Sequence, residues 1–259
     1  MNPEQIISVE DLIRLGAASV LIILVMLLSH IRKLEIISDL AVSSVRAFIQ
    51  LMILALLLQV IFDLQDLFWI ALMLAAMMII ASYTSARRVR DMPQAFRVSA
   101  VSIVTSSSAI ILAMVVLGVI PQKAEYLIPL GGMVIGNAMN ITSLALERLK
   151  GEVSNNVMMI DNMLALGVKS DQAIAPLIKK SIRASLIPTV DNMKTMGLVW
   201  IPGLMSGMII AGMDPGKAAI FQLIIIFMIL ASNTIASVIS TMELSKSMFG
   251  SAEQLVYRP

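Results

Sequence analysis

Long apolar runs alternate with short polar connections along the whole chain. Each run approaches the roughly 20 residues that an α-helix needs to cross the hydrocarbon core of a bilayer. We predict seven such helices, at residues 12–30, 39–62, 67–84, 98–120, 126–147, 195–213 and 217–242. The third run is the shortest, and Pro202 interrupts the sixth. The pattern predicts an all-α, polytopic membrane helix bundle.

Lysine and arginine are distributed unevenly over the connections, and this asymmetry predicts orientation. One alternating set of connections holds only Arg14, Lys123 and Lys217. The other set holds fifteen basic residues: Arg32, Lys33, Arg87, Arg88, Arg90, Arg97, Arg148, Lys150, Lys169, Lys179, Lys180, Arg183, Lys194, Lys246 and Arg258. We therefore expect the N-terminus outside and the C-terminus in the cytoplasm of a cell (plasma or inner) membrane. The N-terminus has no basic region or cleavage site of a signal peptide, so the first helix is expected to stay in the mature chain.

The amino-acid composition excludes several classes of protein function. Of the 259 residues, 58% are hydrophobic and 14% are charged, and the mean hydropathy is +0.91. Soluble domains carry about 25% charged residues, so a soluble enzyme is excluded, and a net charge of +2 gives no sign of a nucleic-acid partner. The chain has no cysteine, one histidine (His30) and no GxxxxGK[ST] motif. We expect no enzyme activity and no cofactor of its own, with any ATP and Mg²⁺ bound by another chain.

The connection at 148–194 is the one long polar segment of a chain that otherwise forms a single transmembrane domain, 1–259. Apolar residues recur in it at helical spacing, and breaks are expected near Gly167 and Pro188. Gly167 suits the left-handed conformation that ends many helices. The pattern predicts two amphipathic helices at the cytoplasmic face. They either rest on lipid headgroups or form a docking element for a soluble partner.

The sequence from Asp161 to Ala173 resembles the EAA loop of ABC-transporter permeases, in which an acidic residue is followed six positions later by glycine. Here the two are Asp161 and Gly167, and the family's Glu-Ala-Ala becomes Asp-Asn-Met. The resemblance implies a coupling helix that fits a cleft on an ATPase subunit. Its contacts would come from Asp161, Asn162, Met163, Leu166 and Gly167.

A second resemblance spans nearly the whole chain. The segments 46–51, 129–140, 187–194 and 201–208 are similar to the FetB/YbbM-type permeases. Members of this family are linked with iron export in bacteria and with aluminium tolerance in plants. The resemblance implies a separate ATPase partner and does not fix the substrate.

Polar residues inside the predicted spans are candidates for a substrate path, because such groups are costly in lipid. In the fifth span Gly132, Gly136, Asn140, Ser143 and Glu147 fall on one helical face, with Asn137 beside it. This face either packs against another helix or also lines the path.

Three further groups of polar or small residues complete the candidate set. Arg46 and Gln50 share a face of the second span, where they either anchor the helix or line the path. Asn233 lies on a polar face of the last span. Gly203 and Gly207 form a small-residue seam suited to a helix or dimer contact.

The leading hypothesis is the permease subunit of an ABC transporter, a homodimer in the bilayer with two ATPase subunits, which exports a metal ion, with iron favoured by the family resemblance. No metal-ligand set is assigned. One alternative keeps this machinery but carries a polar organic substrate such as a nucleotide sugar, because amide and hydroxyl groups suit both. Another is a self-contained channel or secondary carrier.

Overall fold

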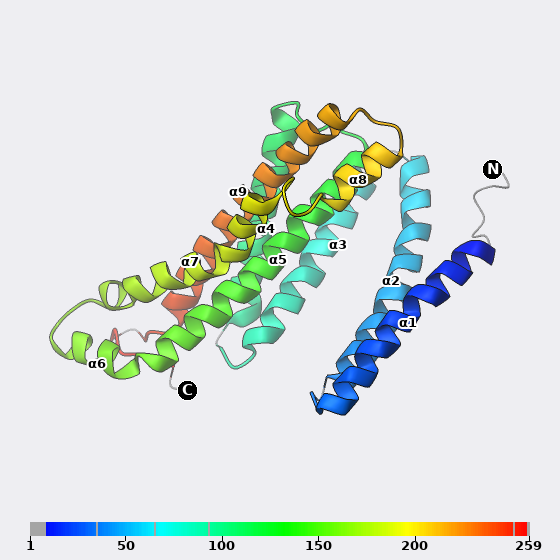
Figure 1. The fold of residues 1–259 in the computed structure, drawn as a ribbon. Coiled ribbons are helices and arrows are strands. Elements are labelled where there is room, and N and C mark those ends of the chain that lie inside the picture. The colour runs from blue at the N-terminus through cyan, green and yellow to red at the C-terminus, as the bar shows by residue number, and fades with distance from the viewer. Residues whose placement is uncertain (1–8, 35, 65, 93, 251, 258–259) are drawn as a thin grey trace. The chain divides into compact units, whose positions relative to one another are not determined.

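The computed structural model describes residues 9–257 except 35, 65, 93 and 251. Arg258, which was counted in the orientation argument, lies outside the described residues. The chain divides into two units, Met1–Leu64 and Gln65–Pro259. Apart from two isolated β-bridges, regular structure in the described residues is helical, which confirms the predicted all-α fold (Figure 1).

The first unit is a helical hairpin. Helix α1 (Val9–Arg32) and helix α2 (Ile37–Leu64) correspond to the first two predicted spans. Lys33 adopts φ +51°, and the Leu34 N–H donates to the carbonyl oxygen of Ser29 at 3.0 Å, so the chain turns tightly between the helices. Most apolar side chains on both helices are exposed within the chain, as expected of helices that face lipid.

The second unit is a bundle of five long helices joined by short segments (Figure 1). They are α3 (Leu67–Ala86), α4 (Ala95–Val116), α5 (Ala124–Asn155), α7 (Ser170–Thr195) and α9 (Pro215–Ser247). The shorter elements are the 3₁₀ turn η2 (Arg87–Val89), α6 (Val157–Ala165) and α8 (Gly203–Ile210). Asp66 and Asp214 accept backbone N–H bonds at the starts of α3 and α9, which fixes where these two helices begin.

Six of the described helical segments are long and apolar enough to cross a membrane. They are Val9–Arg32, Ile37–Phe62, Leu67–Val89, Ala95–Val116, Ala124–Asn155 and Pro215–Ser247. Each contains or overlaps one of the predicted runs, and most extend further. The largest extension is at the fifth run, because α5 continues through the polar residues after 147 to Asn155.

The predicted sixth span, 195–213, does not form a continuous helix. The chain turns at Gly197 (φ +76°), makes a bridge between Met196 and Trp200, and then forms only the eight-residue α8. Eight residues extend about 12 Å, far less than the roughly 30 Å of a hydrocarbon core. Pro202 and the two positive-φ glycines, Gly197 and Gly212, account for the interruption, because neither residue type continues a helix at such a position.

Helix α7 packs against α5 and α9. It runs antiparallel to α9, because Ser185 pairs with Ser237 while the later Thr189 pairs with the earlier Asn233. The break predicted near Pro188 is wrong, since this proline lies inside the continuous α7. Proline is tolerated in packed membrane helices where neighbouring groups satisfy the freed backbone.

A hydrophobic cluster closes the end of the bundle where α5, α6, α7 and α9 meet; we call it the elbow core. Its most deeply buried members include Leu149, Ile160, Ile174, Leu244 and Met248. α6 and the start of α7 are thus built into the bundle. They do not hang from it as a separate loop.

Candidate functional site

The predicted coupling residues lie on α6 and at its C-terminal end. α6 forms because Val157, Ile160 and Leu164 recur on one face, and that face packs on the elbow core. The opposite face carries Met158 and Asn162, which are exposed. The helix is therefore held firmly on one side and open on the other.

Gly167 ends α6 in a Schellman motif. Its φ is +83°, the Gly167 N–H donates to Leu164 at 2.9 Å, and the Val168 N–H donates to Met163 at 3.0 Å. The sequence prediction of a left-handed glycine at this position is confirmed. The motif turns the chain sharply from α6 into α7; we call the segment from Asp161 to Ser170 the elbow.

The five predicted coupling residues do not share one exposed surface. Leu166 is 85% exposed at the tip of the elbow, and Asn162 is also exposed. Asp161 is half-buried, and Met163 packs against the elbow core. Leu166 and Asn162 can therefore meet a partner directly, whereas Met163 supports them from beneath.

The predicted path residues of α5 lie along its outward face. Asn140 and Glu147 are exposed, and Asn137 donates to the carbonyl oxygen of Met133 in its own helix at 2.8 Å. Glu147 lies 3.7 Å from Arg88, a loose ion pair between two exposed side chains. We call Asn137, Asn140 and Glu147 the α5 stripe. Their side chains do not pack in the core of the second unit, so they can contact a partner or a substrate.

The predicted packing glycines differ in what surrounds them. A Cβ at Gly132 would meet the end of the Met77 side chain of α3 at 2.8 Å. Gly136, Gly203 and Gly207 have no atom within 4 Å of an added Cβ. Close approach inside the chain is instead made at Gly131, where a Cβ would lie 2.6 Å from Leu74. That glycine was not among those predicted.

Asn233 is not part of the α5 stripe and is buried between α7 and α9. It is 1% exposed, its amide nitrogen donates to the Thr189 hydroxyl at 3.1 Å, and its Oδ1 atom has no hydrogen-bond partner. One turn away, the hydroxyls of Ser185 and Ser237 lie 2.8 Å apart. These four residues form a polar seam between α7 and α9, which we call the α7–α9 seam.

Sequence reasoning missed the α7 half of this seam. Ser181, Ser185 and Thr189 recur every four residues, the spacing of one helical face. That signal was present but was hidden by the charged residues Lys179, Lys180 and Arg183, which mark the segment as solvent-facing. In the structure these charges lie on the exposed side of α7, and the hydroxyls face inward.

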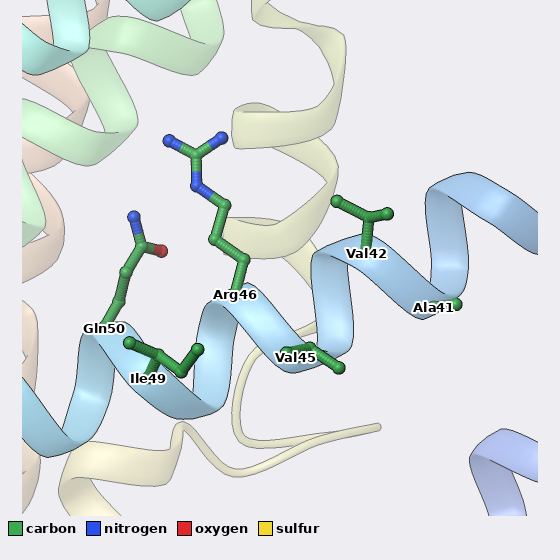
Figure 2. A pocket seen from close by; sticks show the side chains of 6 residues that line it. All are labelled: Ala41, Val42, Val45, Arg46, Ile49 and Gln50. Atoms are coloured by element: carbon green, nitrogen blue, oxygen red, sulfur yellow. The ribbon is translucent and has the colours of Figure 1, made fainter.

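Arg46 and Gln50 belong to the first unit. Figure 2 shows both side chains projecting from the same side of α2, one turn apart. They border a hollow whose remaining lining is apolar: Ala41, Val42, Val45 and Ile49. The shared face predicted from their spacing is confirmed, and their role in a path stays a prediction.

Charge is also organised at the turn between α3 and α4. Lys150 Nζ lies 2.6 Å from Asp91 Oδ2. The hydrogen bond from Lys150 holds the pKa of the Asp91 carboxyl below its ordinary value of 3.8. The pair ties the turn after η2 to α5. By contrast, the described residues contain no group of three or more acidic, histidine or cysteine side chains placed to hold a metal ion.

Comparison with known proteins places the chain in a family. The profile of the Uncharacterised protein family (UPF0014) matches residues 12–249. The chain belongs to this family. It is 36% identical to the "Probable iron export permease protein FetB" of Escherichia coli, covering 93% of each chain.

Two plant proteins are similar over comparable lengths. One is "Protein ALUMINUM SENSITIVE 3" of Arabidopsis thaliana, 32% identical over 96% of this chain and 92% of that protein. The other is "UPF0014 membrane protein STAR2" of rice (Oryza sativa subsp. japonica), 33% identical over 92% and 84%. No solved structure matches the chain significantly. Together with the apolar helices, these relatives establish a multi-pass membrane protein of the UPF0014 family.

Proposed function

We propose that the chain is the permease subunit of an ABC-type transporter that exports a metal ion, with iron as the favoured cargo. ATP and Mg²⁺ would bind a separate ATPase subunit, and the permease would act as a homodimer. The bacterial relative named as a probable iron export permease supports the cargo.

The observation that carries the proposal is the elbow. It presents exposed Leu166 and Asn162 on a turn whose other side is fixed in the elbow core. A rigid docking element of this kind can transmit a movement of the partner to α5, α7 and α9. An interfacial helix resting on lipid would need no such backing.

The cargo path would use oxygen and amide groups. Arg46 and Gln50 on α2, Asn137, Asn140 and Glu147 on α5, and Asn233 on α9 are the candidates. Carboxylate and amide oxygens suit hard cations, but they also suit the hydroxyls of a polar organic molecule such as a nucleotide sugar. The test therefore compares metal ions with nucleotide sugars in one assay.

The test is ATP hydrolysis by the ATPase subunit reconstituted with the chain in vesicles, across a panel of metal ions and nucleotide sugars. We expect one or more metal ions to stimulate hydrolysis. Gly167→Val should abolish stimulation, because a β-branched residue at φ +83° is strained and distorts the elbow. Gly151→Val is the matched control, since its added side chain meets open space and its φ is not positive.

Two results would contradict the proposal. Stimulation by nucleotide sugars alone would replace the metal cargo. Failure of any ATPase to bind the chain, together with transport that needs no ATP, would favour a self-contained carrier.

A further inference from the structure

The segment that follows α9 folds back onto the elbow. We call it the post-α9 turn; it comprises residues 248–250 and 252–257. The Val256 N–H donates to Met248 at 2.8 Å, and the Gly250 N–H donates to Gln254 at 2.9 Å. Met248 and Leu255 are buried in the elbow core together with Ile160 of α6 and Ile174 of α7. The end of α9 is thereby packed against both α6 and α7.

Glu253 of this turn caps α7. The Ser170 N–H, in the first turn of α7, donates to Glu253 Oε2 at 3.0 Å. The residue that precedes α7, Lys169, supplies no side-chain cap. A carboxylate at a helix N-terminus satisfies a free N–H and complements the positive end of the helix dipole. This cap comes from 83 residues further along the chain.

The backbone at Glu253 is unusual for its residue type. Its φ is +59°, in the left-handed region, where glycine or asparagine is the ordinary choice. A glutamate there is strained, and strain that persists in a fold commonly accompanies a specific side-chain task. At Glu253 the side-chain task is to accept the hydrogen bond from the Ser170 N–H.

A hollow of about 470 Å³ separates the elbow from the post-α9 turn. Asp161, Leu164, Gly167 and Val168 line one side, and 252–255 line the other. The two segments thus touch through the Glu253 cap and the buried Leu255, without being packed solid.

We propose that Glu253 is a positioning residue that locks the start of α7 to the end of α9, so that the elbow and the α7–α9 seam move as one body when the ATPase subunit acts. The proposal rests on the proposed coupling to an ATPase. α7 and α9 carry the two sides of the seam, with Ser185 and Thr189 facing Ser237 and Asn233. Tying both helices at the elbow end lets a push on α6 reach the seam without sliding its two sides apart.

The variant that isolates this role is Glu253→Gly. It removes the carboxylate but suits the positive φ, so the turn itself is not strained. The matched control is Glu243→Gln, which removes a carboxylate of α9 that pairs only locally with Lys246 at 2.9 Å. Both are made in the full chain and compared at equal membrane levels.

Two measurements are made on each variant. Hydrogen exchange of residues 167–173 in the purified chain reports the cap, and we expect Glu253→Gly to speed it about fivefold, the factor that a lost cap of usual strength produces. Stimulation of ATP hydrolysis in the reconstituted pair reports coupling, and we expect a several-fold loss with ATPase binding retained. The control should leave both values unchanged.

The outcomes separate the two proposals. Faster exchange with normal stimulation would overturn the positioning role and leave a structural cap. Unchanged exchange would show that the Glu253–Ser170 bond does not hold the elbow. If Gly167→Val also leaves stimulation intact, the proposed ATPase coupling at the elbow itself fails, and the positioning role fails with it.

Discussion

The two ends of α7 are connected in opposite ways. At its start, α6 and the first turns of α7 pack into the elbow core, where Ile160 is completely buried. At its end, the chain passes through α8, which buries no residue. Leu198, before α8, and Ile210, the last residue of α8, are each 87% exposed. The more polar connection is the one built into the bundle, and the more apolar one lies at its surface.

The comparison teaches that the mean hydropathy of a segment indicates its preference for lipid. It does not indicate whether the segment packs into the helix bundle. Residues 195–213 are apolar enough to be predicted as a span, yet glycine and proline prevent a long helix there. Residues 157–178 are interrupted by polar side chains, yet a stripe that includes Ile160, Ala173, Ile174 and Leu177 is enough to bury them. Periodicity decides which segment enters the core.

The largest expected effect is on labelling from the two sides of the membrane. The chain has no cysteine, so Leu166→Cys and Leu198→Cys, both at highly exposed positions, each provide one reactive thiol. If the basic residues set the orientation, Leu166→Cys reacts with an impermeant reagent only after permeabilisation. Because α7 runs antiparallel to α9, its end lies beside the outer connection that precedes α9. Leu198→Cys should therefore react in intact cells, a result that would move Lys194 out of the cytoplasmic set. The reverse pattern would invert the proposed topology.

The next effect is on stability. Ile160→Ala removes a fully buried side chain of the elbow core and should destabilise the fold by about 2–5 kcal/mol. Leu198→Ala, at the other end of α7, should stay within about 0.5 kcal/mol. Thermal unfolding in detergent measures both. Equal losses would mean that the two connections are packed alike.

A smaller effect is expected in the α7–α9 seam. Ser185→Ala, Ser237→Ala and the double variant form a cycle around the 2.8 Å hydroxyl pair. The coupling free energy should be about 0.6 kcal/mol, the usual value for hydrogen bonds between membrane helices. Unfolding by denaturing detergent provides the measurement. Zero coupling would show that the pair does not join α7 to α9.

The smallest effect concerns pH at the α3–α4 turn. Lys150 lowers the pKa of Asp91, so the contribution of this pair is present above the ordinary value of 3.8 and is lost as pH falls through the lowered pKa. Asp91 is half exposed, so screening keeps the contribution below about 1 kcal/mol. Asp91→Asn should lower the melting temperature slightly and equally at pH 5 and pH 7. A difference that changes between those two values would point to another titrating group.

Much of the fold follows from the sequence because long apolar runs leave a helix in lipid few alternatives. Gly167 could be predicted as a turn, since glycine between two apolar stripes is a local signal. The capping of α7 by Glu253 could not, because it depends on two segments far apart in the chain. The inward face of α7 was recoverable from the spacing of Ser181, Ser185 and Thr189, but charges on the opposite face outweighed it.

The composition of α7 also constrains how the chain is made. Machinery that inserts helices as they emerge from the ribosome selects them by apolar length, and lysine or arginine near a helix centre costs about 2.5–3.5 kcal/mol on such a scale. We therefore expect Lys179, Lys180 and Arg183 to disfavour insertion of α7 on its own. Its hydroxyl face finds Asn233 and Ser237 only after α9 has been translated. We therefore expect docking of α7 on α9 to be a late step in the biogenesis of this protein.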